Sequence, residues 1–378
     1  MSFNEIIMLI VAIFFVLGCL DRCLGNKFGL GQSLESGFGF MGPIALSMVG
    51  MICFSPVIAS VLQPVIVPAY QAFGIDPAMF APTFLTADGG GYAIASQIST
   101  DAEMIRFAGL IVGTMVGSTI SFTIPIGVGM IPKEDAKYFA TGIMSAMIAA
   151  PFGCLFAGIA CGVPVGKVVW NLIPIFILSF VIAAAIFLVA SVVIKVFSVF
   201  ARFMTIIITI GLAMAAFTNL TGIELLEGMT DISQGFITVG VVTLIIAGSW
   251  PLAVVLEKVL KVPLNALARL LKIDATATSG LLISLVTALP AFAEYGKMNA
   301  RGKVIVATFA GTMAYMIGPH LGFISATDKT MILPMFISKI SAGIIGIALA
   351  VIVESRIFKN KQENQTNMQN EPVEVITE

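Results

Sequence analysis

Long apolar runs dominate this sequence and limit the folds that it can adopt. A helix that spans a bilayer needs about 20 mostly apolar residues. Runs of this kind lie at 4–20, 39–58, 104–131, 136–163, 168–198, 203–218, 235–256, 303–325 and 331–353. Only 11% of the residues are charged, against about 25% in an ordinary soluble domain, and a soluble fold could not cover so much apolar surface. The pattern predicts an all-α polytopic membrane protein embedded in a lipid bilayer.

The same composition argues against several functions. A formal net charge of −1, without a basic cluster, argues against nucleic-acid binding. One His and five Cys cannot supply a catalytic metal cluster, so no metal or cofactor is expected. The sequence also lacks a His-Glu-x-x-His motif and a paired intramembrane Asp, which argues against a membrane-embedded enzyme.

Two further apolar runs, 78–98 and 275–295, are interrupted. The first breaks at the glycines Gly89, Gly90 and Gly91, and the second breaks at Pro290. If both runs are re-entrant and the basic C-terminal flank is cytoplasmic, 16 of the 20 Lys and Arg residues fall on the cytoplasmic side, as the positive-inside rule requires. This arrangement predicts nine spans, an outward-facing N-terminus and a cytoplasmic C-terminus.

The chain also contains an internal repeat. Pro56 and Pro68 recur at the same spacing as Pro251 and Pro263, and the pair at 86–87 recurs 201 residues later at 287–288. The predicted topology makes the two copies inverted, with two re-entrant or broken helical segments. We expect repeat 1 at 1–165, a linking transmembrane helix at 166–200, the inverted repeat 2 at 201–355, and a disordered cytoplasmic tail at 356–378.

Inverted repeats with broken helices are typical of secondary transporters, whose sites lie near the membrane midplane where the interruptions meet. Asp88 is the leading candidate residue, because a carboxylate inside a bilayer is costly unless it is paired or solvated. It therefore predicts a cationic substrate or coupling cation, although Asp88 would also suit the N-cap of the second half-helix.

The second half offers further candidates, each with a structural alternative. Glu294 either belongs to the site or forms an ion pair with Lys297. His320 follows Gly318 and Pro319, which should unwind that span, and is either a site residue or a core histidine. The remaining candidates are Thr287 and Asn299 as hydrogen-bonding groups, Tyr92, Phe292 and Tyr295 as cation–π faces or packing residues, and Lys339, which either snorkels or pairs with a carboxylate.

Four motifs resemble the EutH family, the ethanolamine permeases of bacterial ethanolamine-utilisation operons. They are G-N-K-F-G-L-G at 25–31, T-A-D-G-G-G-Y at 86–92, G-K-V-I at 302–305 and H-L-G-F at 320–323. The resemblance runs from residue 3 to about 355. It implies a permease of the bacterial cytoplasmic membrane that imports ethanolamine by facilitated uptake of the protonated amine, and it implies Asp88 and His320 as site residues.

Ethanolamine, a small cation with one hydroxyl, fits these candidates. Asp88 supplies a carboxylate, Tyr92 or Tyr295 supplies an aromatic face, and the hydroxyl and amide partners are Thr86, Thr287, Gln97 and Asn299. An inside-negative potential alone favours entry of a monovalent cation by about 2.3 kcal/mol per 100 mV, so coupling to Na⁺ or H⁺ is not required.

Alternative functions and assemblies remain open. An ion-coupled nucleoside-type carrier would use the same two interruptions, with Asp88 and Glu294 holding the ion and a ribose, and a channel is a third alternative. The glycine stripe at 109, 113 and 117 fits packing within one chain or between the subunits of a homo-oligomer.

Overall fold

The structure is a computed structural model that describes residues 1–259 and 261–369 of the chain. Within those residues every regular element is helical. The longer helices are α1 (Phe3–Cys23), α2 (Leu30–Gly39), α3 (Met41–Gln71), α8 (Ala136–Ala160), α9 (Val165–Thr221), α10 (Ile232–Val259), α11 (Lys261–Leu271), α12 (Ala275–Ser284), α14 (Ala300–Thr312) and α16 (Ile332–Gln369). The shorter ones are η1 (Pro77–Met79), α4 (Phe80–Phe84), η2 (Ala87–Gly91), α5 (Tyr92–Ile98), α6 (Ala102–Arg106), η3 (Phe107–Gly117), η4 (Thr119–Thr123), α7 (Ile124–Met130), η5 (Lys133–Asp135), α13 (Leu289–Ala293), η6 (Tyr295–Lys297), α15 (Pro319–Thr327) and η7 (Lys329–Met331).

Eight helical stretches in the described part of the chain are long and apolar enough to cross a membrane, which confirms the prediction of an all-α polytopic membrane protein. They are Phe3–Cys23, Leu30–Gln71, Ala102–Met130, Lys133–Ala160, Val165–Val189, Lys195–Thr221, Ile232–Val259 and Lys329–Arg356. The fifth and sixth belong to α9, which bends where Val189 leaves helical geometry. The eight stretches correspond to eight of the nine predicted spans.

The ninth predicted span, 303–325, is not one helix. It divides into α14 and α15, and the chain between them takes a left-handed conformation at Tyr315 (φ 64°) and a non-helical one at Gly318 (φ −117°, ψ −128°). The N–H groups of Tyr315 and Ile317 donate to the carbonyls of Ser284 and Leu285, at 2.9 Å each. The break therefore lies against the end of α12, which is the other interruption in this half of the chain.

The two interrupted runs have the shape that their sequences predict. In the first, α4 and α5 flank η2, and the chain turns at Gly90 (φ 106°), where a Cβ would overlap the Met51 side chain. In the second, α12 ends at Ser284 and α13 begins at Leu289. Whether these segments are re-entrant stays a prediction.

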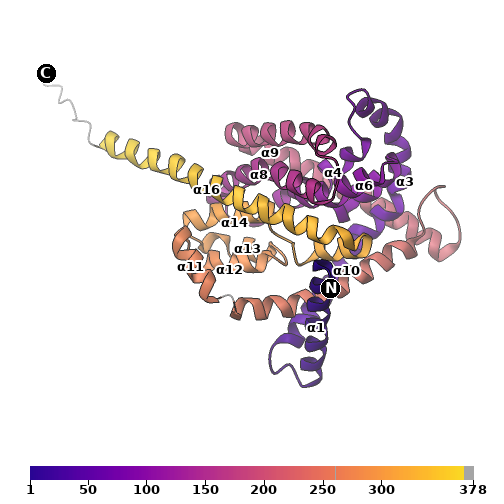
Figure 1. Cartoon of the computed structure of the whole chain (residues 1–378), viewed down its shortest axis with the longest axis horizontal. Helices are drawn as coiled ribbons and strands as arrows, with labels where there is room; N and C mark the ends of the chain where they lie inside the picture. The colour runs from indigo at the N-terminus through magenta and orange to yellow at the C-terminus, as the bar shows by residue number, and fades with distance from the viewer. Residues whose placement is uncertain (260, 370–378) are drawn as a thin grey trace.

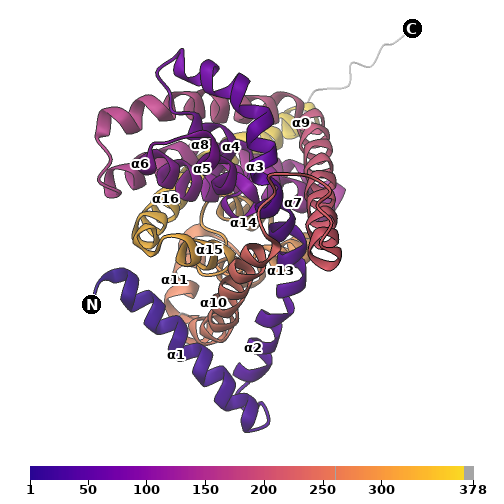
Figure 2. The ribbon, with the colours of Figure 1, turned by 90° about the vertical axis from the view of Figure 1, so that its right-hand side faces the viewer.

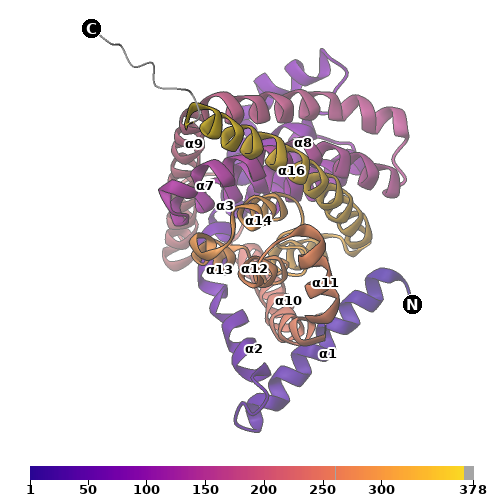
Figure 3. The same cartoon turned by 90° about the vertical axis from the view of Figure 1, so that its left-hand side faces the viewer.

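The helices pack around α8 and α14. Helix α8 contacts α9, α14 and α16, and α10 contacts α1, α2, α3 and α15. Figure 1 shows α16 crossing the molecule obliquely next to α14, while Figure 2 shows α1 and α2 diverging from a shared turn. In Figure 3, α12, α13 and α14 lie together between α10 and α16.

The glycine stripe packs inside the chain. Gly109, Gly113 and Gly117 of η3 lie against Tyr92, Ala87 and Leu85 of the first interrupted run. Helix α16 extends to Gln369, and residues 370–378, at the end of the predicted disordered tail, lie outside the described residues. The division into two repeats, a linking helix and a tail stays a prediction.

Candidate functional site

The interrupted segments of the two halves line one interior space, which we name the central cavity. Its volume is about 310 Å³. From the first half it is lined by Thr86 and Asp88, and from the second half by Thr287 and His320. The structure thus brings together four of the sequence-predicted site residues from segments about 200 positions apart, and Pro319 lines the cavity as well.

Asp88 reaches the cavity because the helix breaks beside it. The Thr86 hydroxyl donates to its Oδ1 atom, and the backbone N–H of Thr86 donates to the Ser121 hydroxyl at 3.1 Å. The Asp88 side chain is half-buried, and no Lys or Arg within the described residues forms an ion pair with it. A carboxylate in such a place favours a cation as its partner.

His320 lies in the first turn of α15, directly after the break at Gly318 and Pro319. The residue is 4% exposed, and its Nδ1 atom has no hydrogen-bond partner in the described structure. The Tyr315 ring packs edge-on against the imidazole, with 5.3 Å between the ring centroids. A buried ring nitrogen without a partner is an unusual feature, because buried polar atoms normally find one, and a ligand hydroxyl would satisfy it.

Sequence reasoning missed the aromatic part of this wall. Tyr315, Trp250, Phe122 and Phe40 line the central cavity, as does Ser118. Tyr315 was detectable in principle, because it stands in the turn before the Gly318-Pro319 break. The others lie in ordinary apolar runs, where the sequence does not say which face meets a cavity.

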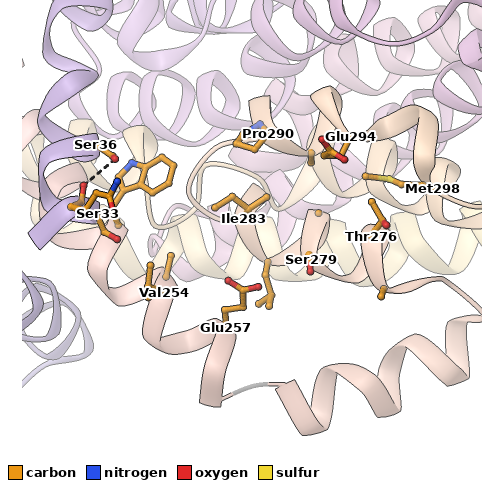
Figure 4. Close-up of a pocket in the computed structure, with 17 residues that line it drawn as sticks. Ser33, Ser36, Val254, Glu257, Thr276, Ser279, Ile283, Pro290, Glu294 and Met298 are labelled. Carbon is orange, nitrogen blue, oxygen red and sulfur yellow. Dashed lines mark hydrogen bonds between the residues drawn. The ribbon is translucent and has the colours of Figure 1, made fainter. Parts of the chain in front are cut away.

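A second cavity, of about 660 Å³, adjoins the first and shares Trp250 with it. It lies between α2, α10, α12 and α13, and the Glu257 and Glu294 carboxylates are on its lining (Figure 4). Glu294 also forms an ion pair with Lys297 at 2.6 Å, and both side chains are well exposed. Of the sequence-predicted site residues, Glu294 and Pro290 belong to this cavity and not to the central one.

The remaining predicted residues lie outside both linings, and contacts elsewhere account for most of them. The Tyr295 hydroxyl donates to the Lys303 carbonyl at 2.8 Å, and its ring packs with Phe292 and Phe139. Tyr92 packs edge-on against Phe323. The last two predicted residues are Asn299, which caps the start of α14 by accepting from the Gly302 N–H, and Gln97, whose side chain is exposed.

Fold and site together define a polytopic helical membrane protein with an acidic, aromatic-walled interior cavity between broken helices. The model of the family described as "Ethanolamine utilisation protein, EutH" matches residues 3–353. The chain therefore belongs to the EutH family, as its motifs indicated.

The chain is similar in sequence to several curated proteins over nearly their whole length. The chain is 40% identical to a Listeria monocytogenes protein named "Probable ethanolamine permease EutH", over 97% of this chain and 98% of that one. Proteins of the same name from Salmonella typhimurium and Escherichia coli are 33% and 32% identical, over 93% and 96% of this chain and 96% and 99% of theirs. No solved structure matches this chain.

Proposed function

We propose that this chain is a permease that carries ethanolamine, as the protonated amine, across the bacterial cytoplasmic membrane through the central cavity. One observation carries the proposal: Asp88, a carboxylate without a basic partner in the described structure, faces a cavity formed by the broken helices of both halves. The names of the relatives support the same substrate.

The cavity lining matches both ends of ethanolamine. The ammonium group would lie at the Asp88 carboxylate, which forms charge-assisted hydrogen bonds, beside aromatic faces such as Trp250 that favour cations. The hydroxyl would reach the unpartnered Nδ1 of His320 or the Thr287 hydroxyl. The volume of about 310 Å³ is at the small end of ligand pockets, which suits a substrate of four heavy atoms.

The second cavity supplies a route to this site. It meets the central cavity at Trp250 and carries the carboxylates of Glu257 and Glu294, which would raise the local concentration of a cation. Basic residues flank it, including Lys258 and Lys297, so the positive-inside rule supports a cytoplasmic opening. The same rule supports a cytoplasmic C-terminus.

Two equivalent contacts support the internal repeat. Gly117 packs against the Leu85 carbonyl so closely that a Cβ would overlap it, and Gly318 packs in the same way against the Val286 carbonyl. Each member of the second pair stands 201 positions after its counterpart. In each half, therefore, a glycine of the span that follows lies against the carbonyl of the residue just before Thr86 or Thr287.

Two ion pairs join the two halves of the chain. Arg106, at the start of the span Ala102–Met130, pairs with Asp328, just after α15, at 3.5 Å. Lys303, near the start of α14, pairs with Asp135, just after the same first-half span, at 2.6 Å. Neither pair follows the offset of 201 positions, so the pairs connect the halves without bearing on the repeat.

Uptake of labelled ethanolamine by proteoliposomes, with and without an inside-negative potential, tests the proposal. Asp88→Asn removes the charge but keeps the shape and the capping ability of the side chain. Glu103→Gln is the matched control, because it removes an exposed carboxylate that lines neither cavity. We expect saturable, potential-dependent uptake that is lost in Asp88→Asn and retained in Glu103→Gln.

Two results would contradict the proposal. Absence of ethanolamine flux in correctly inserted protein would remove the substrate. Saturable uptake that survives Asp88→Asn would keep the permease but remove the carboxylate from its site.

A further inference from the structure

Lys339 has no carboxylate partner in the described structure, although it lies deep in the protein. It stands on α16 within a membrane-spanning stretch, and its side chain is 2% exposed. Its Nζ atom donates to three backbone carbonyls, those of Thr114 at 3.1 Å, Thr312 at 3.3 Å and Ala314 at 2.9 Å. The side chain therefore neither snorkels to the membrane surface nor joins a carboxylate, the two alternatives that the sequence left open.

The three carbonyls belong to backbone that is interrupted or distorted. Thr312 is the last residue of α14, and Ala314 lies in the break that follows. Thr114 lies in the π-helix η3. The last carbonyls of a helix have no partner within it and form the negative end of its dipole. No bulk water reaches them inside a membrane, so they need a donor or a cation.

A lysine ammonium satisfies this need completely. It has three N–H donors and no acceptor, and three carbonyls surround it here. In secondary transporters, the carbonyls of unwound helices and of half-helix C-termini are also the groups that coordinate Na⁺. The Lys339 ammonium thus occupies a place whose chemistry suits a free cation.

We propose that the Lys339 ammonium takes the place of a bound Na⁺. It stabilises the backbone of the break after α14, so the transport cycle does not require bound Na⁺. This inference rests on the proposed transport function. The carbonyls that Lys339 holds lead directly into Tyr315, which lines the central cavity and packs against His320. Lys339 touches no substrate in this scheme. It is a positioning residue that fixes one wall of the cavity.

Two substitutions separate charge from packing. Lys339→Ala removes the ammonium and leaves a space bounded by the three carbonyls, whereas Lys339→Met removes the charge but fills the space. Ser338→Ala is the control, because Ser338 is a fully buried neighbour on the same helix. Ethanolamine uptake and the thermal midpoint without substrate are measured in N-methylglucamine buffer, with and without added Na⁺ or methylammonium.

We expect wild type and Ser338→Ala to be insensitive to the added cations. Both Lys339 variants should lose uptake by about tenfold or more in N-methylglucamine, since tenfold corresponds to about 1.4 kcal/mol, within the range of the cost of one buried acceptor left without a hydrogen bond. Na⁺ or methylammonium should restore uptake and raise the midpoint in Lys339→Ala but not in Lys339→Met.

Three results would overturn the inference: Na⁺-dependent uptake by wild type, undiminished uptake in Lys339→Met, or a loss in Lys339→Ala that no small cation repairs. If Lys339→Ala does not yield folded protein, Lys339→Arg, which keeps the charge, is compared with Lys339→Met, and equal loss in both would contradict the role of charge. The midpoint needs no substrate, so a cation-dependent midpoint in Lys339→Ala supports the inference even if ethanolamine proves not to be transported.

Discussion

Replacement of Asp135 by Asn is expected to destabilise the protein far more than replacement of an equally short but exposed ion pair. The Asp135 carboxylate lies 2.6 Å from the Lys303 ammonium, and the two side chains are only 6% and 11% exposed. The pair joins η5 to α14. Asp135 accepts no helix-capping hydrogen bond through its side chain, so its substitution tests the ion pair alone.

The size of the effect follows from burial. At 2.6 Å and an effective dielectric constant of about 20, two unit charges attract by roughly 6 kcal/mol, and desolvation offsets much of this. Removal of one partner leaves the other charge buried and typically costs about 3–5 kcal/mol. With an unfolding entropy of about 2.1 cal/mol/K per residue, this cost corresponds to a fall in Tm of roughly 4–6 °C for a chain of 378 residues.

The assay is thermal unfolding of the purified protein in detergent, followed by intrinsic fluorescence. Glu294→Gln is the control, because Glu294 and Lys297 are also 2.6 Å apart but their side chains are 50% and 71% exposed. Exposed pairs contribute about 0–1 kcal/mol, so its midpoint should move by roughly 1 °C or less.

The double variant Asp135→Asn, Lys303→Met leaves no buried charge at this position and should recover most of the lost stability. If Glu294→Gln costs as much as Asp135→Asn, or if the double variant is as unstable as the sum of the two single variants, the argument from burial is wrong.

Two further predictions concern the breaks and the loop before α6. Gly117→Ala and Gly318→Ala should each destabilise the protein by roughly 1–3 kcal/mol through overpacking. Gly129→Ala, where a Cβ meets nothing within 4 Å, should be neutral or slightly stabilising. The Tm values of the three variants are compared, and equal effects would contradict the close packing of Gly117 and Gly318 on backbone carbonyls. Burial raises the pKa of Asp101, but the hydrogen bond and ion pair with Lys167 and the N–H groups of α6 outweigh it, so the pKa lies below its ordinary value of 3.8. The stabilising contribution of the Asp101 carboxylate should therefore be full at neutral pH and disappear as the pH falls through this lowered pKa. The Tm difference between wild type and Asp101→Asn should vanish in acid. A difference that stays constant with pH would contradict the stabilising role of the ionised carboxylate.

The sequence was sufficient to predict most of the helical architecture, because the length of apolar runs is set by the thickness of the bilayer. It also placed two of the breaks, since Gly89–Gly91 and the Gly318-Pro319 pair are unfavourable in helix interiors. The break predicted at Pro290 lies a few residues earlier, at 285–288, and Pro290 stands in the first turn of α13, where proline is tolerated. The ninth predicted span, 303–325, consists of two short helices, α14 and α15, and composition alone does not show that the backbone between them is held by carbonyls at the end of α12.

The site was harder to predict than the fold. Asp88 and His320 stood out because charged and titratable groups are rare in apolar segments. Tyr295 was also a candidate, as a cation–π face or a packing residue, but its hydroxyl is already satisfied by the Lys303 carbonyl. Trp250, which lines both cavities, gave no signal at all. A sequence reveals which residues are costly to bury, but tertiary contacts decide which of them are already satisfied.

The placement of the candidate site at two breaks has a physical reason. A continuous membrane helix uses its backbone groups internally and offers a ligand only side chains. At Asp88 and at His320 the helix has just been interrupted, so the side chain and the nearby backbone can both face the cavity. At each break a glycine packs on a backbone carbonyl, Gly117 on that of Leu85 and Gly318 on that of Val286. These contacts leave no room for a side chain, so a movement of either packed segment would shift the cavity wall. Under the proposed transport function, this would couple the site to an alternating-access cycle.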